Sequence, residues 1–119
     1  MSNFEAQVFD IEAAGNAYVV EFNREGIKAA DELGVFNNDA SILTKRPALI
    51  LYAGLKMHKP DITPNLAAKI WDNMQAEGYT VRDFNESIGD EFTRCFNAFF
   101  LDGGKKKILP RNLKLAASK

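Results

Sequence analysis

The chain has 119 residues, of which 46% are hydrophobic, and a formal net charge of −1. This length fits one domain, and the apolar content is enough for a packed core and too high for a disordered protein. The longest apolar run, residues 48–55, is far shorter than the roughly 20 residues that span a bilayer. Residues 1–10 lack the basic start and apolar stretch of a signal peptide. We therefore expect a cytosolic protein without a membrane segment.

Residues 7–22 alternate in polarity as β-strands do. Apolar side chains occupy every second position, at Phe9 and Ile11 and then at Tyr18, Val20 and Phe22. Between these two sets, Gly15 and Asn16 tolerate the positive φ angles of a tight turn. Because a two-stranded hairpin is marginal alone, we expect it to pack against helices through the apolar face of its second strand.

Residues 23–34 predict a short helix, with Asn23 as its N-cap and Gly34 as the left-handed residue that ends it. We expect its inner stripe to consist of Ile27, Ala30 and Leu33. The next residues, 35–46, are polar and irregular, and we interpret them as a loop with at most one helical turn.

Two further helices follow, separated by Pro60. The first begins at Pro47 and is apolar on nearly every side, which predicts a buried central helix. The second begins with Pro64 after the N-cap Thr63, carries Trp71 on its flank and ends at Gly78. Its inner apolar residues at helical spacing are Leu66, Ala67, Ile70 and Met74.

Residues 80–102 predict the last helix. Thr80 and Asp83 resemble a capping box, with aspartate in place of the usual glutamate. We interpret Gly89 as the site of a close helix crossing, and Gly103 and Gly104 as the end of the helix. An apolar stripe at 3.6-residue spacing runs through Phe84, Ile88, Phe92, Cys95, Phe96 and Phe99.

These elements predict a mainly α (α+β) fold, with an N-terminal β-hairpin packed on a bundle of about four helices. We assign residues 1–104 to one domain and residues 105–119 to a flexible basic tail. Residues 103–119 hold six basic side chains and no acidic one, so the other nine basic and all 16 acidic side chains give residues 1–102 a net charge of −7. The tail is suited to contact its own body, a partner or nucleic acid.

Residues suited to catalysis or metal binding are sparse. His58, the only histidine, lies at a helix end, where the helix dipole favours a cation. Cys95 falls on the apolar stripe, as a buried structural thiol does, and one cysteine and one histidine are too few for the usual zinc sites. Phosphate-binding motifs are also absent from the sequence, so we expect no enzyme and no cofactor. A paired-carboxylate site stays open, but we interpret five carboxylates as solvated helix faces: Asp31, Glu32, Glu86, Asp90 and Glu91.

Nucleic-acid binding would rest on the tail alone, and the acidic body argues against it. The basic tail residues concerned are Lys105, Lys106, Lys107, Arg111 and Lys114. Protein–protein interaction is favoured instead, with aromatic side chains as anchors. The candidates are Phe36, Tyr52, Trp71, Phe99 and Phe100, and the alternative for each is that it completes the core. Since Phe99 and Phe100 are adjacent, they cannot share one helix face, and we expect one of them to face the core.

Residues 9–35 resemble the opening of phage tail assembly chaperones of the long-tailed siphophage type. In that family a strand pair precedes a helix that ends in glycine, and the matching residues here are Ile11, Gly15, Tyr18, Val20, Phe22, Leu33 and Gly34. Residues 47–74 are similar to the family's middle part, in which an apolar helix, a basic or histidine-containing turn and a second helix follow one another. The resemblance covers roughly residues 7–100. It departs at Val19 and Val20, where the family often has a charged residue and leucine.

The resemblance implies a protein of the host cytoplasm that binds the tape-measure protein, helps to recruit the tail-tube protein and is absent from the mature virion. Homo-oligomers such as rings or filaments are compatible with it. The family often makes a longer product by programmed ribosomal frameshifting, and codons 104–107, for Gly-Lys-Lys-Lys, can supply the adenine run that slippage requires. The alternative is a small phage-encoded inhibitor or adaptor that binds a host protein.

Overall fold

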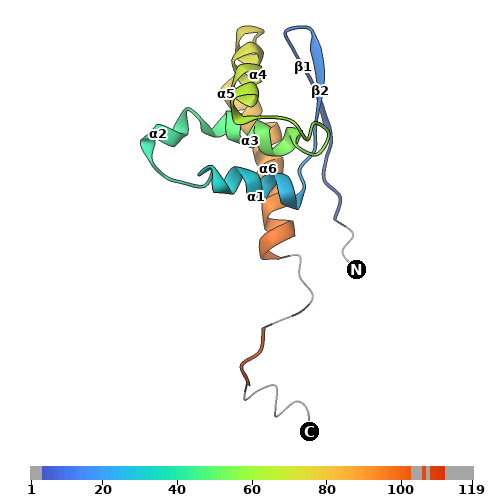
Figure 1. The fold of residues 1–119 in the computed structure, drawn as a ribbon, viewed down its shortest axis with the longest axis vertical. Coiled ribbons are helices and arrows are strands. Elements are labelled where there is room, and N and C mark those ends of the chain that lie inside the picture. Colours follow the sequence, from blue (N-terminus) through green and yellow to red (C-terminus); the bar gives the residue numbers. More distant parts are fainter. Residues whose placement is uncertain (1–3, 103–105, 107, 112–119) are drawn as a thin grey trace.

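The computed structural model describes residues 4–102, 106 and 108–111 (Figure 1). It contains strands β1 (Phe9–Ala13) and β2 (Asn16–Val20) and helices α1 (Arg24–Glu32), α2 (Ala40–Leu43), α3 (Arg46–Leu55) and α4 (Pro64–Ala76). The last helix then runs through α5 (Val81–Phe84), a π-helical segment (Asn85–Gly89), α6 (Asp90–Phe96) and a second π-helical segment (Asn97–Leu101). The expected mainly α fold with an N-terminal β-hairpin is confirmed.

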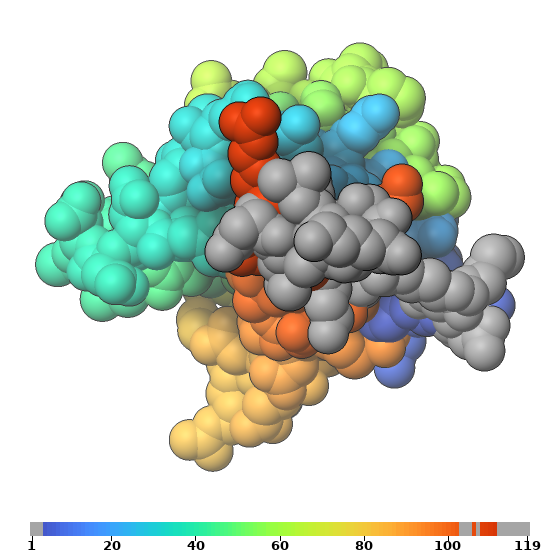
Figure 2. Space-filling view, turned by 90° about the horizontal axis from the view of Figure 1, so that it is seen from below, coloured from blue at the N-terminus to red at the C-terminus, as the bar shows by residue number. Residues whose placement is uncertain are grey.

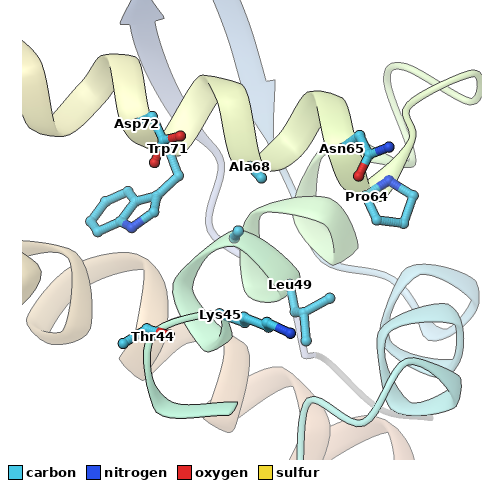
Figure 3. A pocket seen from close by; sticks show the side chains of 9 residues that line it. Thr44, Lys45, Leu49, Pro64, Asn65, Ala68, Trp71 and Asp72 are labelled. Carbon is cyan, nitrogen blue, oxygen red and sulfur yellow. The ribbon is translucent and has the colours of Figure 1, made fainter. Parts of the chain in front are cut away.

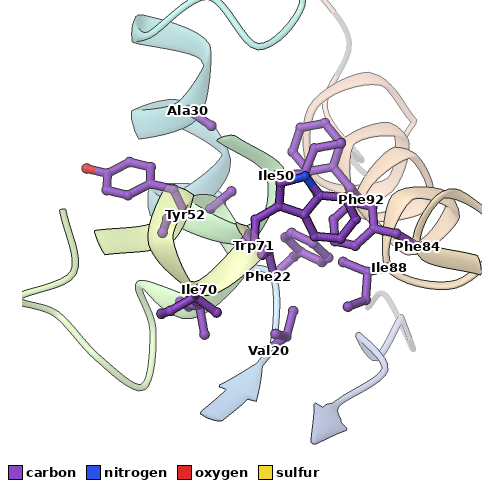
Figure 4. Close-up of a cluster of buried hydrophobic side chains, with 14 of the residues drawn as sticks. Val20, Phe22, Ala30, Ile50, Tyr52, Ile70, Trp71, Phe84, Ile88 and Phe92 are labelled. Atoms are coloured by element: carbon purple, nitrogen blue, oxygen red, sulfur yellow. The ribbon is translucent and has the colours of Figure 1, made fainter. Parts of the chain in front are cut away.

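Helix α3 lies in the middle of the molecule, where it packs against α1, α4, β2 and the last helix (Figure 1). It is buried on nearly every side, as its composition predicts. The core around it joins side chains from every large element (Figure 4), including Val20, Phe22, Ile50, Trp71 and Phe92. In the described part of the chain, none of the helices combines the length and the apolar content that a membrane span requires.

The antiparallel hairpin pairs Phe9 with Val20 and ends at the pair Ala13 and Asn16. Its two turn residues are therefore Ala14 (φ 52°) and Gly15 (φ 79°). The turn thus lies one residue earlier than the predicted turn at Gly15 and Asn16. Two consecutive positive φ angles give the turn the twist that a tight hairpin needs. The Ala14 N–H donates a 2.6 Å hydrogen bond to Glu77 Oε2 just after α4, and this contact holds an alanine in a conformation that alanine disfavours.

Helix α1 begins and ends as its sequence predicts. The Asn23 side chain accepts a 2.8 Å hydrogen bond from the Gly26 N–H, and the chain reverses at Gly34 (φ 89°). After the reversal, the Val35 N–H reaches back to the Ala30 carbonyl at 3.1 Å. The prediction that Leu33 belongs to the inner stripe is wrong, because the reversal leaves Leu33 44% exposed and buries Val35 in its place.

The close crossings in this fold occur at Gly26 and Gly54. A Cβ atom on Gly26 would lie 2.2 Å from the Ala53 carbonyl oxygen, and one on Gly54 would lie 2.5 Å from Val20 Cγ1. Both positions therefore exclude any side chain and let α1 and β2 approach α3 closely. The expected close crossing at Gly89 is wrong, since a Cβ atom there would meet only atoms of its own helix, none nearer than 3.5 Å.

The segment between α1 and α3 contains only the one-turn helix α2, as expected. This segment projects from one side of the body (teal in Figures 1 and 2). Its base is fixed by Arg46, whose Nε donates a 2.9 Å hydrogen bond to the Val35 carbonyl and whose Nη2 donates to the Asn37 carbonyl. One side chain thus closes the loop between α1 and α3.

Helix α4 begins as predicted, because Thr63 Oγ1 accepts a 3.1 Å hydrogen bond from the Leu66 N–H. Of its four predicted inner residues, Ala67, Ile70 and Met74 are fully buried, whereas Leu66 is half-buried. Trp71 is also buried, at 4% exposure, and does not lie on an open flank. Its ring packs 4.8 Å from that of Phe84 and so joins α4 to the last helix (Figure 4).

The last helix buries Phe84, Ile88, Phe92 and Cys95, while Phe96 and Phe99 are half-buried. The expected α-helical spacing is wrong in one respect, since two π-helical segments alternate with α5 and α6. A π-helical turn takes more residues than the 3.6 of an α-helix. The alternation therefore keeps a four-residue repeat of apolar side chains, at positions 84, 88, 92, 96 and 100, on one side of the helix.

Candidate functional site

A cleft of about 340 Å³ lies between the start of α3 and helix α4 (Figure 3). We call it the α3–α4 cleft. Its apolar lining consists of Ala48, Leu49, Pro64, Ala68 and Trp71, and polar side chains stand around it at Thr44, Lys45, Asn65 and Asp72. An apolar floor with a polar rim is the usual composition of a protein-binding surface.

The walls of the α3–α4 cleft are fixed by the core. Trp71 points from α4 toward α3 (Figure 3) and is held from behind by the Phe84 ring, 4.8 Å away. Ala68 carries too little side chain to fill the space beside it, and Leu49 is half-buried on the facing helix. The cleft is therefore preformed and can accept apolar side chains from a partner.

A second hollow, of about 470 Å³, lies near Met57, just after the end of α3, and we call it the Phe99 groove. It is bounded by the N-terminal segment, the junction of β2 and α1, the end of α3 and the last helix. Its apolar lining residues are Phe4, Ala6, Phe22, Met57 and Phe99, and two carboxylates, Glu5 and Glu21, lie among them. A smaller hollow with Arg24 and Glu25 adjoins it at Asn23 and Phe99.

The N-terminal wall of the Phe99 groove is held by Glu91, which corrects its interpretation as a solvated residue. Glu91 is only 4% exposed, and its carboxylate accepts hydrogen bonds from Arg94 (2.8 and 2.9 Å), the Gln7 N–H (2.7 Å) and Cys95 Sγ (3.3 Å). Arg94 also donates to the Glu5 carbonyl at 2.9 Å and lies 4.4 Å from the centre of the Phe4 ring. We call this set of contacts the Glu91 clasp.

The clasp sets the protonation of its members. Burial acts to raise the pKa of Glu91, but the hydrogen bonds from Arg94, Gln7 and Cys95 outweigh it and hold this pKa below its usual value. Burial, followed by the hydrogen bond to Glu91, raises the pKa of Cys95 to about 12. Cys95 is fully buried, as its place on the apolar stripe predicts, and its thiol stays protonated at neutral pH.

The five aromatic candidates do not form one site. Trp71 lines the α3–α4 cleft, Phe99 lines the Phe99 groove, and Tyr52 is buried at 9% exposure beneath Lys56. Phe36 and Phe100 each pack against Phe96, with 4.6 and 5.6 Å between the ring centres. Phe36 keeps 39% exposure.

Neither Phe99 nor Phe100 is fully buried, so the two share the edge of the core. Phe99 meets the Phe4 ring edge-on at 5.2 Å. Phe100 faces the other side, where the Arg24 guanidinium lies 4.5 Å from its ring centre and Arg24 Nη1 donates to the Phe99 carbonyl. Arg24 thus places a cation at the C-terminal end of the last helix, where the helix dipole favours it.

The remaining polar candidates lie on the surface. His58 forms a 2.8 Å contact between its Nε2 and Glu21 Oε1, so its helix-end position also places it beside a carboxylate. Lys106 and Arg111 are exposed, whereas Lys105, Lys107 and Lys114 fall outside the described residues. Within the described ranges, no cluster of three His, Cys, Asp or Glu side chains is arranged to hold a metal ion.

Sequence reasoning missed Leu49, Ala68 and Met57, which shape the two hollows. Ala68 follows the buried Ala67 on α4, and a small residue beside a core position is the one signal that could have indicated a cleft. Met57, which lies just after α3, is 44% exposed.

In comparisons with known protein families, curated proteins and solved structures, nothing matches this chain.

Proposed function

We propose that this protein is a phage tail assembly chaperone that binds apolar helical segments of the tape-measure protein in the host cytoplasm. In this role it also helps to recruit tail-tube subunits and leaves before the virion is complete. The observation that supports the proposal most is the α3–α4 cleft, together with the order of elements that prompted the family resemblance. The cleft has an apolar floor and a volume of about 340 Å³, and it lies between two fixed helices.

The lining of the cleft suits one kind of ligand. An amphipathic helix places apolar side chains three or four residues apart on one face, and such a face docks into an apolar groove between helices. Lys45 and Asp72 at the rim offer one charge of each sign to the polar flanks of that helix. Trp71 and Leu49 supply the apolar contact, and a tryptophan in a fixed pocket is a favourable interface anchor.

Co-purification with the tape-measure protein tests the proposal. The protein is co-expressed with the tape-measure protein of the same virus, as wild type, as Ala68→Arg in the cleft, and as the matched control Ala76→Arg. Ala76 is exposed in the last turn of the same helix and lies outside the cleft. We expect the wild type and Ala76→Arg to retain the tape-measure protein and Ala68→Arg to lose it, with all three folded by circular dichroism.

Two results would contradict the proposal. Retention of the partner by Ala68→Arg would show that the α3–α4 cleft is not the binding surface. Capture of a host protein in place of the tape-measure protein by the wild type would favour the alternative, an inhibitor or adaptor.

The longer frameshifted product belongs to the same proposal. Codons 104–107 encode Gly-Lys-Lys-Lys, and we propose that they contain the slip site. The nucleotide sequence decides this directly, because AAG codons that interrupt the adenine run, with no overlapping frame downstream, would exclude slippage at this point.

A further inference from the structure

The Phe99 groove is acidic as well as apolar. Glu5 and Glu21 lie in it, and the adjoining hollow contains Glu25 together with Arg24, so carboxylates outnumber cations across the two hollows. In the described part of the chain, Glu5 and Glu25 take part in no ion pair, and Glu21 meets only His58. Residues 1–102 as a whole carry a net charge of −7. The groove is therefore matched to a ligand that combines apolar and basic side chains.

The basic tail has this composition. From residue 105 onward its sequence is KKKILPRNLKLAASK, which contains both apolar and basic residues and no acidic residue. Of the described tail residues, Ile108 is 99% exposed, and Leu109 is 38% exposed. An apolar side chain that is fully exposed on a basic segment offers an unused contact surface.

The direction of the tail indicates which molecule it would reach. Residues 106 and 108–111 lie below the last helix, away from the hairpin and from helices α3 and α4 (Figure 1). A segment directed away from its own body is placed to meet the body of a second molecule.

We propose that the Phe99 groove of one molecule binds the basic tail of a second copy. Ile108 and Leu109 enter the apolar part of the groove beside Met57 and Phe99, and the neighbouring basic side chains face the three glutamates. The donor tail and the acceptor groove are different surfaces. The contact therefore closes a dimer where two copies exchange tails, and it produces open chains or larger rings where they do not. This assembly does not depend on the proposed tape-measure partner.

Two full-length variants separate the donor from the acceptor. The groove variant Met57→Lys places a cation where the tail would bind, at a residue that is 44% exposed. The tail variant combines Lys106→Gln, Ile108→Ser and Arg111→Gln, all at exposed positions. Leu43→Lys is the matched control for the groove variant, because Leu43 is 60% exposed on α2 and far from the groove.

The mass of each protein is measured by analytical ultracentrifugation from low to high concentration, at low and high salt. We expect the wild type and Leu43→Lys to form dimers or larger assemblies as concentration rises, less so at high salt, because added salt screens exposed charges. The groove variant and the tail variant should each stay monomeric. Their mixture should form a 1:1 complex and nothing larger, since it restores one intact tail and one intact groove.

Three outcomes would overturn the proposal. A wild type that stays monomeric at every concentration shows that the tail binds its own groove or none. Assembly that persists in either single variant places the contact elsewhere. A mixture that remains monomeric, although the wild type assembles, shows that the tail and the groove are not partners.

Discussion

The α3–α4 cleft and the Phe99 groove are both apolar hollows, but their walls are held in different ways. The cleft lies between two helices whose inner residues belong to the core, and its tryptophan rests on Phe84. One wall of the groove is the N-terminal segment before β1, which has no regular secondary structure and is held by the Glu91 clasp. Core packing therefore fixes the first hollow, whereas the second is fixed by the Glu91 clasp together with the contact between the Phe4 and Phe99 rings.

This difference has a consequence for stability and for motion. Opening the cleft requires loss of buried apolar contacts and so approaches global unfolding. Opening the groove requires release of Gln7 and Glu5 from Glu91 and Arg94 and separation of the Phe4 ring from Arg94 and Phe99. We expect the groove to open locally while the rest of the fold stays intact.

The largest effect is expected from Phe84→Ala. Phe84 is 3% exposed and supports Trp71, so its truncation should cost about 3–5 kcal/mol in the free energy of unfolding. Partner binding at the cleft should weaken with it, because Trp71 loses its support. Urea denaturation measures the cost, and a value below about 1 kcal/mol would show that the last helix does not pack on α4 as described.

A smaller and more local effect is expected from Glu91→Gln. The substitution removes the charge that Arg94 and the Gln7 N–H contact, and we expect a loss of about 1–3 kcal/mol. Hydrogen exchange at Gln7 should accelerate more than exchange within α3. The control is Glu86→Gln, an exposed residue of the same helix, which should leave both quantities unchanged. Equal acceleration throughout the chain would mean that the groove does not open separately.

The contribution of Glu91 depends on pH in a defined direction. Its pKa in the folded protein lies below its usual value of 4.5, so the unfolded chain takes up the proton first as the pH falls. The stabilisation is complete above about pH 4.5 and is lost as the pH falls through the folded pKa. The difference in unfolding free energy between the wild type and Glu91→Gln should therefore shrink below pH 4.5. A difference that grows on acidification would contradict the described hydrogen bonds.

The smallest effect is expected at the hairpin, far from both hollows. Ala14 has a φ of 52° and asparagine tolerates this conformation better, so Ala14→Asn should stabilise the protein by about 0.5–1 kcal/mol. The backbone hydrogen bond from position 14 to Glu77 is retained. Thermal unfolding measures the gain, and a loss of stability would mean that the turn does not comprise residues 14 and 15.

Local signals in the sequence predicted most of the fold. The caps at Asn23 and Thr63, the alternation in the strands and the apolar run of α3 each depend on residues close together in the chain. The Glu91 clasp could not be predicted in this way, because Glu91 and Gln7 lie 84 residues apart. An acidic residue beside an arginine on a helix has the pattern of a solvated pair, and only the approach of the N-terminal segment buries it.

The candidate sites were predicted only in part. Trp71 and Phe99 each line one hollow, but the sequence did not show which helices would face them. The apolar stripe from Phe84 to Phe99 was predicted at 3.6-residue spacing, but the two π-helical segments that change this spacing were not expected. Leu49 lies opposite Ala68 because α3 packs against α4. This packing depends on the whole core, so no single segment of the sequence predicts it.

Trp71 provides the most direct test of the central claim, that the α3–α4 cleft binds a helical partner. It is the only tryptophan in the chain, so its indole N–H gives a single signal in an NMR titration. We predict that a helical segment of the tape-measure protein shifts this signal in the wild type and in Met57→Lys, but not in Ala68→Arg. A complex that forms while the Trp71 signal stays unchanged would contradict the account.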